Sequence, residues 1–120
     1  MSEVTPGRRI FETGIVAIIR GIEAHVCNEV VTALAAGGVE TIEITANTPG
    51  AIEMIRQVSD EVDDIIIGAG TVLDSETARA VQLAGAEFVV TPAVNTDVIE
   101  TCNRYGTPIA TGVLTPTEAV

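Results

Sequence analysis

Five short apolar runs alternate with four longer segments of helical periodicity along the chain. The apolar runs, which are typical of strands, are Ile15–Ile19, Thr41–Thr45, Ile65–Ile67, Glu87–Val90 and Ile109–Ala110. The helical segments are Ala24–Ala36, Gly50–Val58, Ser75–Ala84 and Thr96–Tyr105. Strands that alternate with helices predict a parallel sheet of the α/β class, because parallel neighbours are joined by crossover helices.

Residues that start and stop helices fall between these segments. Thr48 before Pro49 and Asp74 before Ser75 are candidate N-caps, since their side-chain oxygens can accept from the first free amides of a helix. Glycines follow three of the segments, where helices commonly end; they are Gly37, Gly85 and Gly106. No linker or low-complexity stretch divides the chain, so we expect residues 1–120 to form a single domain.

Two architectures accommodate five such units. One is a complete, doubly wound sheet of flavodoxin type, which the length favours. The other is the first five strand–helix units of a (β/α)8 barrel, which typically needs about 250 residues in all. Thr115, Pro116 and Glu118 form a capping-box pattern two residues before the last residue, and a helix start of this quality is of little use without further turns. We therefore expect a partial TIM barrel whose chain stops within the fold.

Charge narrows the range of partners. Seventeen acidic residues against six arginines give a net charge of −11, which argues against nucleic acid and anionic membranes as partners. A dense acidic surface also fits a high-salt cytoplasm. No apolar run approaches the roughly 20 residues that span a bilayer, and no secretory signal opens the chain, so we expect a cytoplasmic location.

Glu43 is the foremost candidate for chemistry. In the run Thr41–Thr45, Ile42 and Ile44 share one face, and the glutamate shares the other with the two threonines. A central parallel strand is covered on both faces, so burial should raise the pKa of this carboxyl toward that of a general base. The alternatives are an edge position or a purely structural partner for an arginine.

Further polar and small residues follow the other predicted strands. Arg20 ends the first strand, and Gly68–Thr71 follows the third with backbone amides and a hydroxyl suited to an anion. Leu73 stands where a dinucleotide fingerprint needs Gly or Ala, which excludes a Rossmann site. Thr91-Pro92 and Thr111-Gly112 follow the fourth and fifth strands. Because parallel strands end at one edge of the sheet, we expect all these residues to meet there.

The other reactive residues give weaker evidence of a function. Cys27 and Cys102 lack metal-ligand or redox spacing and are predicted to be reduced, buried and apolar in character. His25, the sole histidine, lies in a polar stretch early in a helix and is predicted to be a surface residue. No group of His, Cys and Asp has the spacing of a metal site.

Several of these stretches together carry a family resemblance. They are Val16–Arg20, Gly37–Val39, Ile42–Thr45, Ile67–Val72, Thr91-Pro92 and Gly112–Glu118. They resemble, in the same order, the 2-keto-3-deoxy-6-phosphogluconate / 4-hydroxy-2-oxoglutarate (KDPG/KHG) aldolase family. The resemblance implies a (β/α)8 barrel, generally a homotrimer, that cleaves a 2-keto-3-deoxy acid into pyruvate and an aldehyde, commonly glyceraldehyde 3-phosphate, without a cofactor.

The resemblance also implies roles for residues. Glu43 would be the base that moves protons at the C4 hydroxyl of the substrate and at the pyruvate methyl, while Arg20, Thr71 and Pro92 would line the site around the keto-acid and phosphate groups. Asn47 stands where many members place a phosphate-binding arginine. This asparagine resembles the branch that acts on the galactonate-derived epimer.

The nucleophile implied by the resemblance is missing from these residues. The family's imine-forming lysine follows the sixth strand, and none of the 120 residues is a lysine. Since the imine supplies the electron sink for C–C cleavage, we expect the chain as given to be inactive as an aldolase. The alternative is a non-catalytic five-stranded module that binds a small anionic metabolite.

Overall fold

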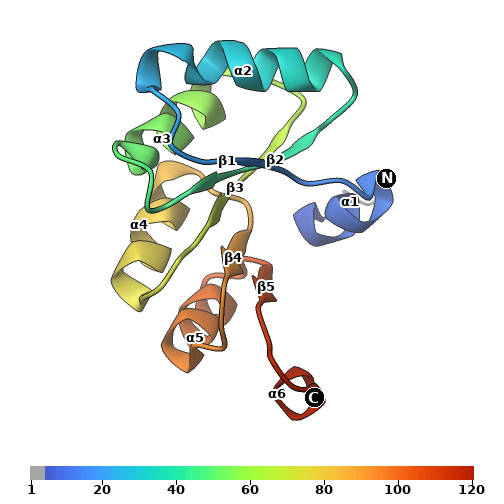
Figure 1. Ribbon diagram of the computed structural model, residues 1–120, viewed down its shortest axis with the longest axis vertical. Helices are drawn as coiled ribbons and strands as arrows, with labels where there is room; N and C mark the ends of the chain where they lie inside the picture. The colour runs from blue at the N-terminus through green and yellow to red at the C-terminus, as the bar shows by residue number, and fades with distance from the viewer. Residues whose placement is uncertain (1–4) are drawn as a thin grey trace.

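The computed structural model describes residues 5–120 and contains one parallel sheet of five strands (Figure 1). The strands are β1 (Ala17–Ile19), β2 (Thr41–Thr45), β3 (Ile66–Gly70), β4 (Val89–Thr91) and β5 (Ile109–Thr111). The helices are α1 (Pro6–Thr13), α2 (Ala24–Ala36), α3 (Ala51–Glu61), α4 (Ser75–Ala84), α5 (Thr96–Arg104) and α6 (Pro116–Ala119). The predicted alternation of parallel strands and helices is confirmed.

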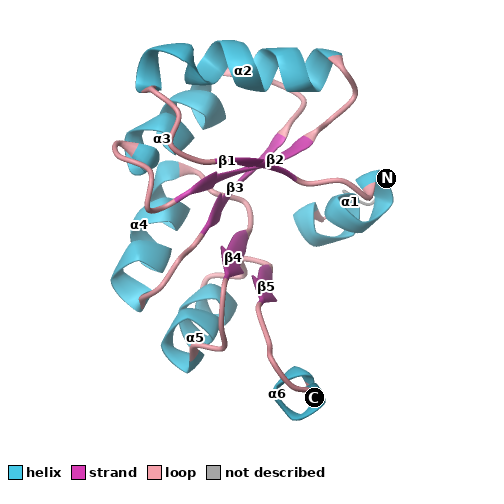
Figure 2. Cartoon of the chain, in the orientation of Figure 1, coloured by secondary structure: helices cyan, strands magenta, loops and turns pink. Residues whose placement is uncertain are grey.

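The order of the strands decides between the two predicted architectures. A flavodoxin-type sheet has the order 2-1-3-4-5, because its chain reverses direction after the first strand and places helices on both faces. Here the order follows the sequence from β1 to β5, and each neighbouring pair is parallel. Helices α2 to α5 follow one another along one side of the sheet (Figures 1 and 2). This singly wound arrangement is that of a (β/α)8 barrel.

The side chains of β2 alternate between the two faces of the sheet. Ile42 and Ile44 are completely buried in the apolar core under the helices. The core is completed by one fully buried side chain from each covering helix, among others: Val31, Ile55, Val81 and Val98. Thr41, Glu43 and Thr45 alternate with the isoleucines and occupy the opposite, inner face. The predicted alternation of faces is therefore confirmed.

Helix α1 was not predicted from the sequence. Thr5 caps its first turn by accepting from the Arg8 amide, Pro6 occupies the first helical position, and Gly14 ends it with a φ of +70°. Unlike α2 to α5, α1 lies on the inner side of the sheet (Figure 1). These are ordinary start and stop signals, but the helix has only eight residues and none of them is buried.

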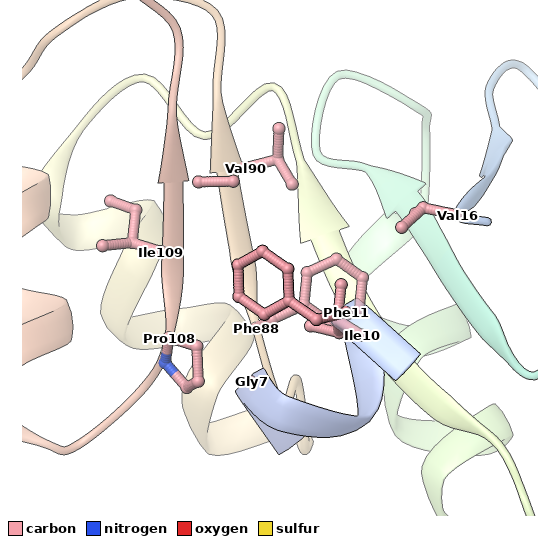
Figure 3. Close-up of a pocket in the computed structure, with 9 residues that line it drawn as sticks. Gly7, Ile10, Phe11, Val16, Phe88, Val90, Pro108 and Ile109 are labelled. Atoms are coloured by element: carbon pink, nitrogen blue, oxygen red, sulfur yellow. The ribbon is translucent and has the colours of Figure 1, made fainter. Parts of the chain in front are cut away.

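Two polar contacts hold α1 at the amino-terminal ends of the strands. The Thr13 hydroxyl lies 3.1 Å from the Thr41 hydroxyl, and an Arg9 nitrogen lies 3.6 Å from a carboxylate oxygen of Glu40. Between the helix and the sheet lies an apolar cavity of about 140 Å³, which Phe11 and Phe88 line together with other side chains (Figure 3). The amino-terminal end of the inner face is thus covered by a helix.

The predicted bounds of α2 and α4 are confirmed, whereas α3 begins one residue later and ends three residues later than predicted, and one predicted cap is wrong. Asp74 caps α4 by accepting from the Thr77 amide, and Gly37 and Gly85 end α2 and α4. Thr48 is not the cap of α3, which begins at Ala51 after Gly50. Its hydroxyl has another partner, described below.

The predicted start of α6 is confirmed, and the predicted end of α5 differs by one residue. Thr115 and Glu118 form the predicted capping box at the start of α6, with each side chain bonded to the other's backbone amide. Helix α5 ends at Arg104, one residue earlier than predicted, and Gly106 lies just beyond it.

Candidate active site

Glu43 lies in the middle of β2 on the inner face, and the residue is only 5% exposed. Gly68 and Gly70, predicted to follow the third strand as part of an anion-binding turn, instead lie within β3 and pair with β2, where they make room for this face. Gly68 is the register partner of Glu43, and a side chain there would overlap the ring of Phe88. A side chain at Gly70 would overlap the Glu43 carboxylate itself. The carboxylate therefore occupies the space that the missing side chain of Gly70 leaves above β3.

Two opposing effects set the protonation of Glu43. Burial, the larger effect, raises the pKa of its carboxyl, because the charged form loses hydration. The positive charge of Arg20 lowers the pKa in part, and the net direction is upward. A carboxylate with a raised pKa accepts and returns a proton at neutral pH more readily than an ordinary glutamate.

Arg20 and Thr71 meet beside this carboxyl. Arg20 follows β1 directly and is exposed, and its Nη2 donates to the Thr71 Oγ1 at 3.1 Å. Thr71 follows β3 with a φ of +54°, a left-handed conformation that non-glycine residues seldom adopt. An exposed guanidinium and a threonine hydroxyl are suitable donors for a carboxylate or a phosphate. The structure thus brings together three of the predicted residues, one from within β2 and two from the ends of its neighbours β1 and β3.

Pro92 and Asn47 lie at the same edge of the sheet but are not part of this cluster. Asn47 follows β2 and Pro92 follows β4, and both are exposed. Within residues 5–120, no hydrogen bond joins the side chain of Asn47 to another residue. Gly112 packs closely on the Pro92 backbone, and its amide donates to the Thr91 carbonyl at 2.9 Å. The turns after β4 and β5 are thereby held against each other.

Sequence reasoning missed a pair of buried hydroxyls behind the cluster. Thr48 Oγ1 accepts from the Gly21 amide at 3.0 Å and lies 2.8 Å from Thr45 Oγ1. Thr45 is 0% and Thr48 3% exposed. The signal was present as two threonines three positions apart, but a threonine before proline is also a common start of a helix. The partner that decides between these interpretations is 27 residues away in the sequence.

The two cysteines and the single histidine lie as the sequence predicted. Cys27 and Cys102 are buried free cysteines as predicted, and burial raises the pKa of both thiols. His25 is a surface residue beside Glu23. In the part of the chain that the structure describes, no group of three or more His, Cys, Asp or Glu is arranged to hold a metal ion. No helix in that part is both long and apolar enough to cross a membrane.

Five parallel strands in sequence order, with helices along one face and polar groups at their carboxyl ends, define part of a TIM barrel. Comparison with known proteins then identifies the family. The sequence profile described as KDPG and KHG aldolase matches residues 8–120, so the chain belongs to the KDPG/KHG aldolase family.

Relatives of known sequence agree with this assignment. The 2-dehydro-3-deoxy-phosphogluconate aldolase of Treponema pallidum is 43% identical over 86 residues, which cover 72% of this chain and 41% of that protein. The 2-dehydro-3-deoxy-6-phosphogalactonate aldolase of Escherichia coli is 35% identical over 106 residues, which cover 88% of this chain and 52% of that protein.

Solved structures agree as well. The KDPG aldolase from Legionella pneumophila, with pyruvate captured as a covalent carbinolamine intermediate, superposes with a TM-score of 0.88 at 28% identity. That match covers 97% of this chain and 56% of the other. The chain therefore spans roughly two fifths to just over half the length of these relatives.

Proposed function

We propose that the chain forms, as one domain, the first five strand–helix units of a class I aldolase. Its substrate would be 2-keto-3-deoxy-6-phosphogluconate or the galactonate epimer, cleaved to pyruvate and glyceraldehyde 3-phosphate. The observation that carries the proposal is the buried Glu43 carboxyl beside the Arg20 guanidinium at the carboxyl ends of the strands. The relatives named above, which are aldolases of both phosphogluconate and phosphogalactonate type, support it.

Glu43 is assigned the proton transfers. As a carboxylate it removes the proton of the C4 hydroxyl, the C3–C4 bond breaks, and the aldehyde leaves. The electron pair of that bond passes to the nitrogen of an imine at C2. The protonated Glu43 then returns its proton to C3, which becomes the methyl group of pyruvate. A raised pKa suits both halves of this cycle, because the same group must accept and then donate.

Arg20 and Thr71 are assigned to substrate binding. The guanidinium is the positive charge of this cluster, and the Thr71 hydroxyl is already within hydrogen-bond distance of it. Together they bind the anionic groups of the substrate, and Pro92 forms part of the wall. Asn47 lies exposed on the loop after β2. Its amide, in place of a guanidinium, favours the galactonate epimer.

The imine requires an amine that these residues do not contain, since none of the 120 is a lysine. A lysine outside this sequence would supply it, so we expect the 120 residues alone to show no turnover. The homotrimer, the cytoplasmic location and the adaptation to high salt stay predictions; sedimentation would test the first, and salt-dependent stability measurements would test the third.

Covalent trapping tests the proposal. The protein, expressed at its native length, is incubated with pyruvate and sodium borohydride, and its intact mass is measured. We expect an increase equal to one reduced pyruvate per chain, located on a lysine by peptide mapping. Binding of pyruvate without any covalent adduct would instead favour the non-catalytic, anion-binding alternative.

A further inference from the structure

The turn that carries Arg20 has little support from the sheet. The register of β1 with β2 ends at the pair Ile19 and Ile44, one residue before the arginine. Gly21, the next residue, has a φ of +67° and turns the chain away from the sheet. Some other contact must therefore fix the backbone at this point.

The Thr48 hydroxyl provides that contact. It accepts the Gly21 amide at 3.0 Å, which connects the turn after β2 to the turn after β1. Thr45 lies 2.8 Å behind it at the end of β2 and fixes the rotamer of Thr48 through a second hydrogen bond. Both threonines are buried, so water does not compete for these bonds. The amide that they hold belongs to the peptide that joins Arg20 to Gly21.

We propose that Thr45 and Thr48 form a positioning pair that holds Arg20 beside Glu43 and Thr71. Neither threonine touches substrate; each acts through the backbone of the β1 turn. The assignment of this cluster to a substrate site rests on the proposed function, whereas the mechanical link between Thr48 and Arg20 rests on the hydrogen bonds alone.

The charge of Arg20 gives a direct readout. Among the described residues, Arg20 is the charged side chain that acts on the pKa of Glu43, and it lowers that pKa. The experiment is an NMR titration of the Glu43 carboxyl carbon, without substrate, in protein of native length. The variant Arg20→Met first measures the full upward shift that loss of the charge causes.

Thr48→Val then removes the hydroxyl and keeps the shape of the side chain. We expect the pKa of Glu43 to rise in this variant by part of the Arg20→Met shift, because the guanidinium is no longer held in place. Thr48→Ser should restore the original value. Thr41→Val is the matched control: it removes a buried hydroxyl at the opposite end of β2, which bonds to Thr13, and should leave the pKa of Glu43 unchanged.

Three results would overturn the proposal. An unchanged Glu43 pKa in Thr48→Val, or an equal rise in Thr41→Val, overturns the proposal, and so does Arg20→Met without a shift. If Thr48→Val does not fold, Thr48→Cys makes the same test, since a thiol is only a weak acceptor. Failure of the borohydride experiment would remove the aldolase assignment and leave this titration as an independent measure of the link.

Discussion

At each end of strand β2, a hydrogen bond between two threonine hydroxyls holds a neighbouring segment. At the amino-terminal end the Thr41 hydroxyl meets that of Thr13 and holds a helix, α1, over an apolar cavity. At the carboxyl end the Thr45 hydroxyl meets that of Thr48 and holds a turn beside charged side chains. What each hydroxyl pair contributes depends on the segment that it fixes, which is a helix over apolar side chains at one end and the turn of Arg20 at the other.

Each end also carries an arginine close to glutamates. Arg9 lies near Glu40 and lowers the pKa of Glu87, whose burial nonetheless raises that pKa overall. Arg20 has the corresponding relation to Glu43. Two carboxyls with raised pKa values thus lie beside the same sheet, Glu43 within β2 and Glu87 just before β4, and only Glu43 is proposed to react. This symmetry supplies controls for most experiments.

The largest expected difference between the ends is in turnover. Glu43→Gln should lower kcat by about 10²–10⁴-fold, because it removes the proposed proton acceptor and keeps its shape. Glu87→Gln removes the other carboxyl of raised pKa and should leave kcat unchanged. Steady-state cleavage assays on protein of native length measure both. Equal losses in the two variants would contradict a special role for Glu43.

The next effect comes from the glycines of β3. Gly70→Ala places a methyl group against the Glu43 carboxylate, and Gly68→Ala places one against the Phe88 ring. Both should cost about 1–3 kcal/mol of unfolding free energy, because the space is already filled. Only Gly70→Ala should lose activity beyond its loss of stability. Urea unfolding combined with assays distinguishes them, and a larger activity loss in Gly68→Ala would be evidence against the site.

The pH dependence of stability offers a smaller effect. Since the folded-state pKa of Glu43 is raised, its contribution is fully present below the ordinary glutamate pKa and is lost as pH rises through the raised value. Asp74 has the opposite sign: its cap bonds lower its pKa, so its contribution is lost as pH falls through the lowered value. Urea unfolding across pH should show a shallower decline in Glu43→Gln than in the wild type. Parallel curves would contradict the raised pKa.

The smallest effect is expected at the surface arginine. Arg9→Met should cost less than about 1 kcal/mol, because the ion pair with Glu40 is partly exposed and its two side chains remain 38% and 49% accessible. The pKa of Glu87 should rise in this variant, whereas that of Glu43 should not. Thermal unfolding and a carboxyl titration measure the two quantities. A shift at Glu43 would show that the two ends are electrostatically coupled.

Much of the fold was predictable because local signals agreed with tertiary structure. Helix α2 and helix α4 have the predicted bounds, since apolar periodicity and terminal glycines coincide there. Strand β2 and the burial of Glu43 followed from alternation within a central strand. The order of the strands was predicted from the capping box at Thr115–Glu118, which favoured a partial barrel, and not from the run of elements, which both architectures share.

The site was predicted less completely for a related reason. The strand-end rule placed Arg20 and Thr71 at one edge, and the structure joins them. Thr48 was misassigned because its local context, a threonine before proline, indicates a helix cap, and its actual partner Gly21 is distant in sequence. Helix α1 was missed since it is short and none of its residues is buried, so its pattern resembles that of a loop.

The hydrogen bond between Gly21 and Thr48 also connects the loop after β1 to the loop after β2, whose sequences could otherwise change independently. Asn47 precedes Thr48 directly, and Arg20 precedes Gly21 directly, so each loop's exposed polar residue is adjacent to one end of the same hydrogen bond. Substitutions at these two positions should therefore be epistatic, with a double-mutant coupling that vanishes in a Thr48→Val background. Under selection for a new substrate, the two loops would then change together, as one inherited unit.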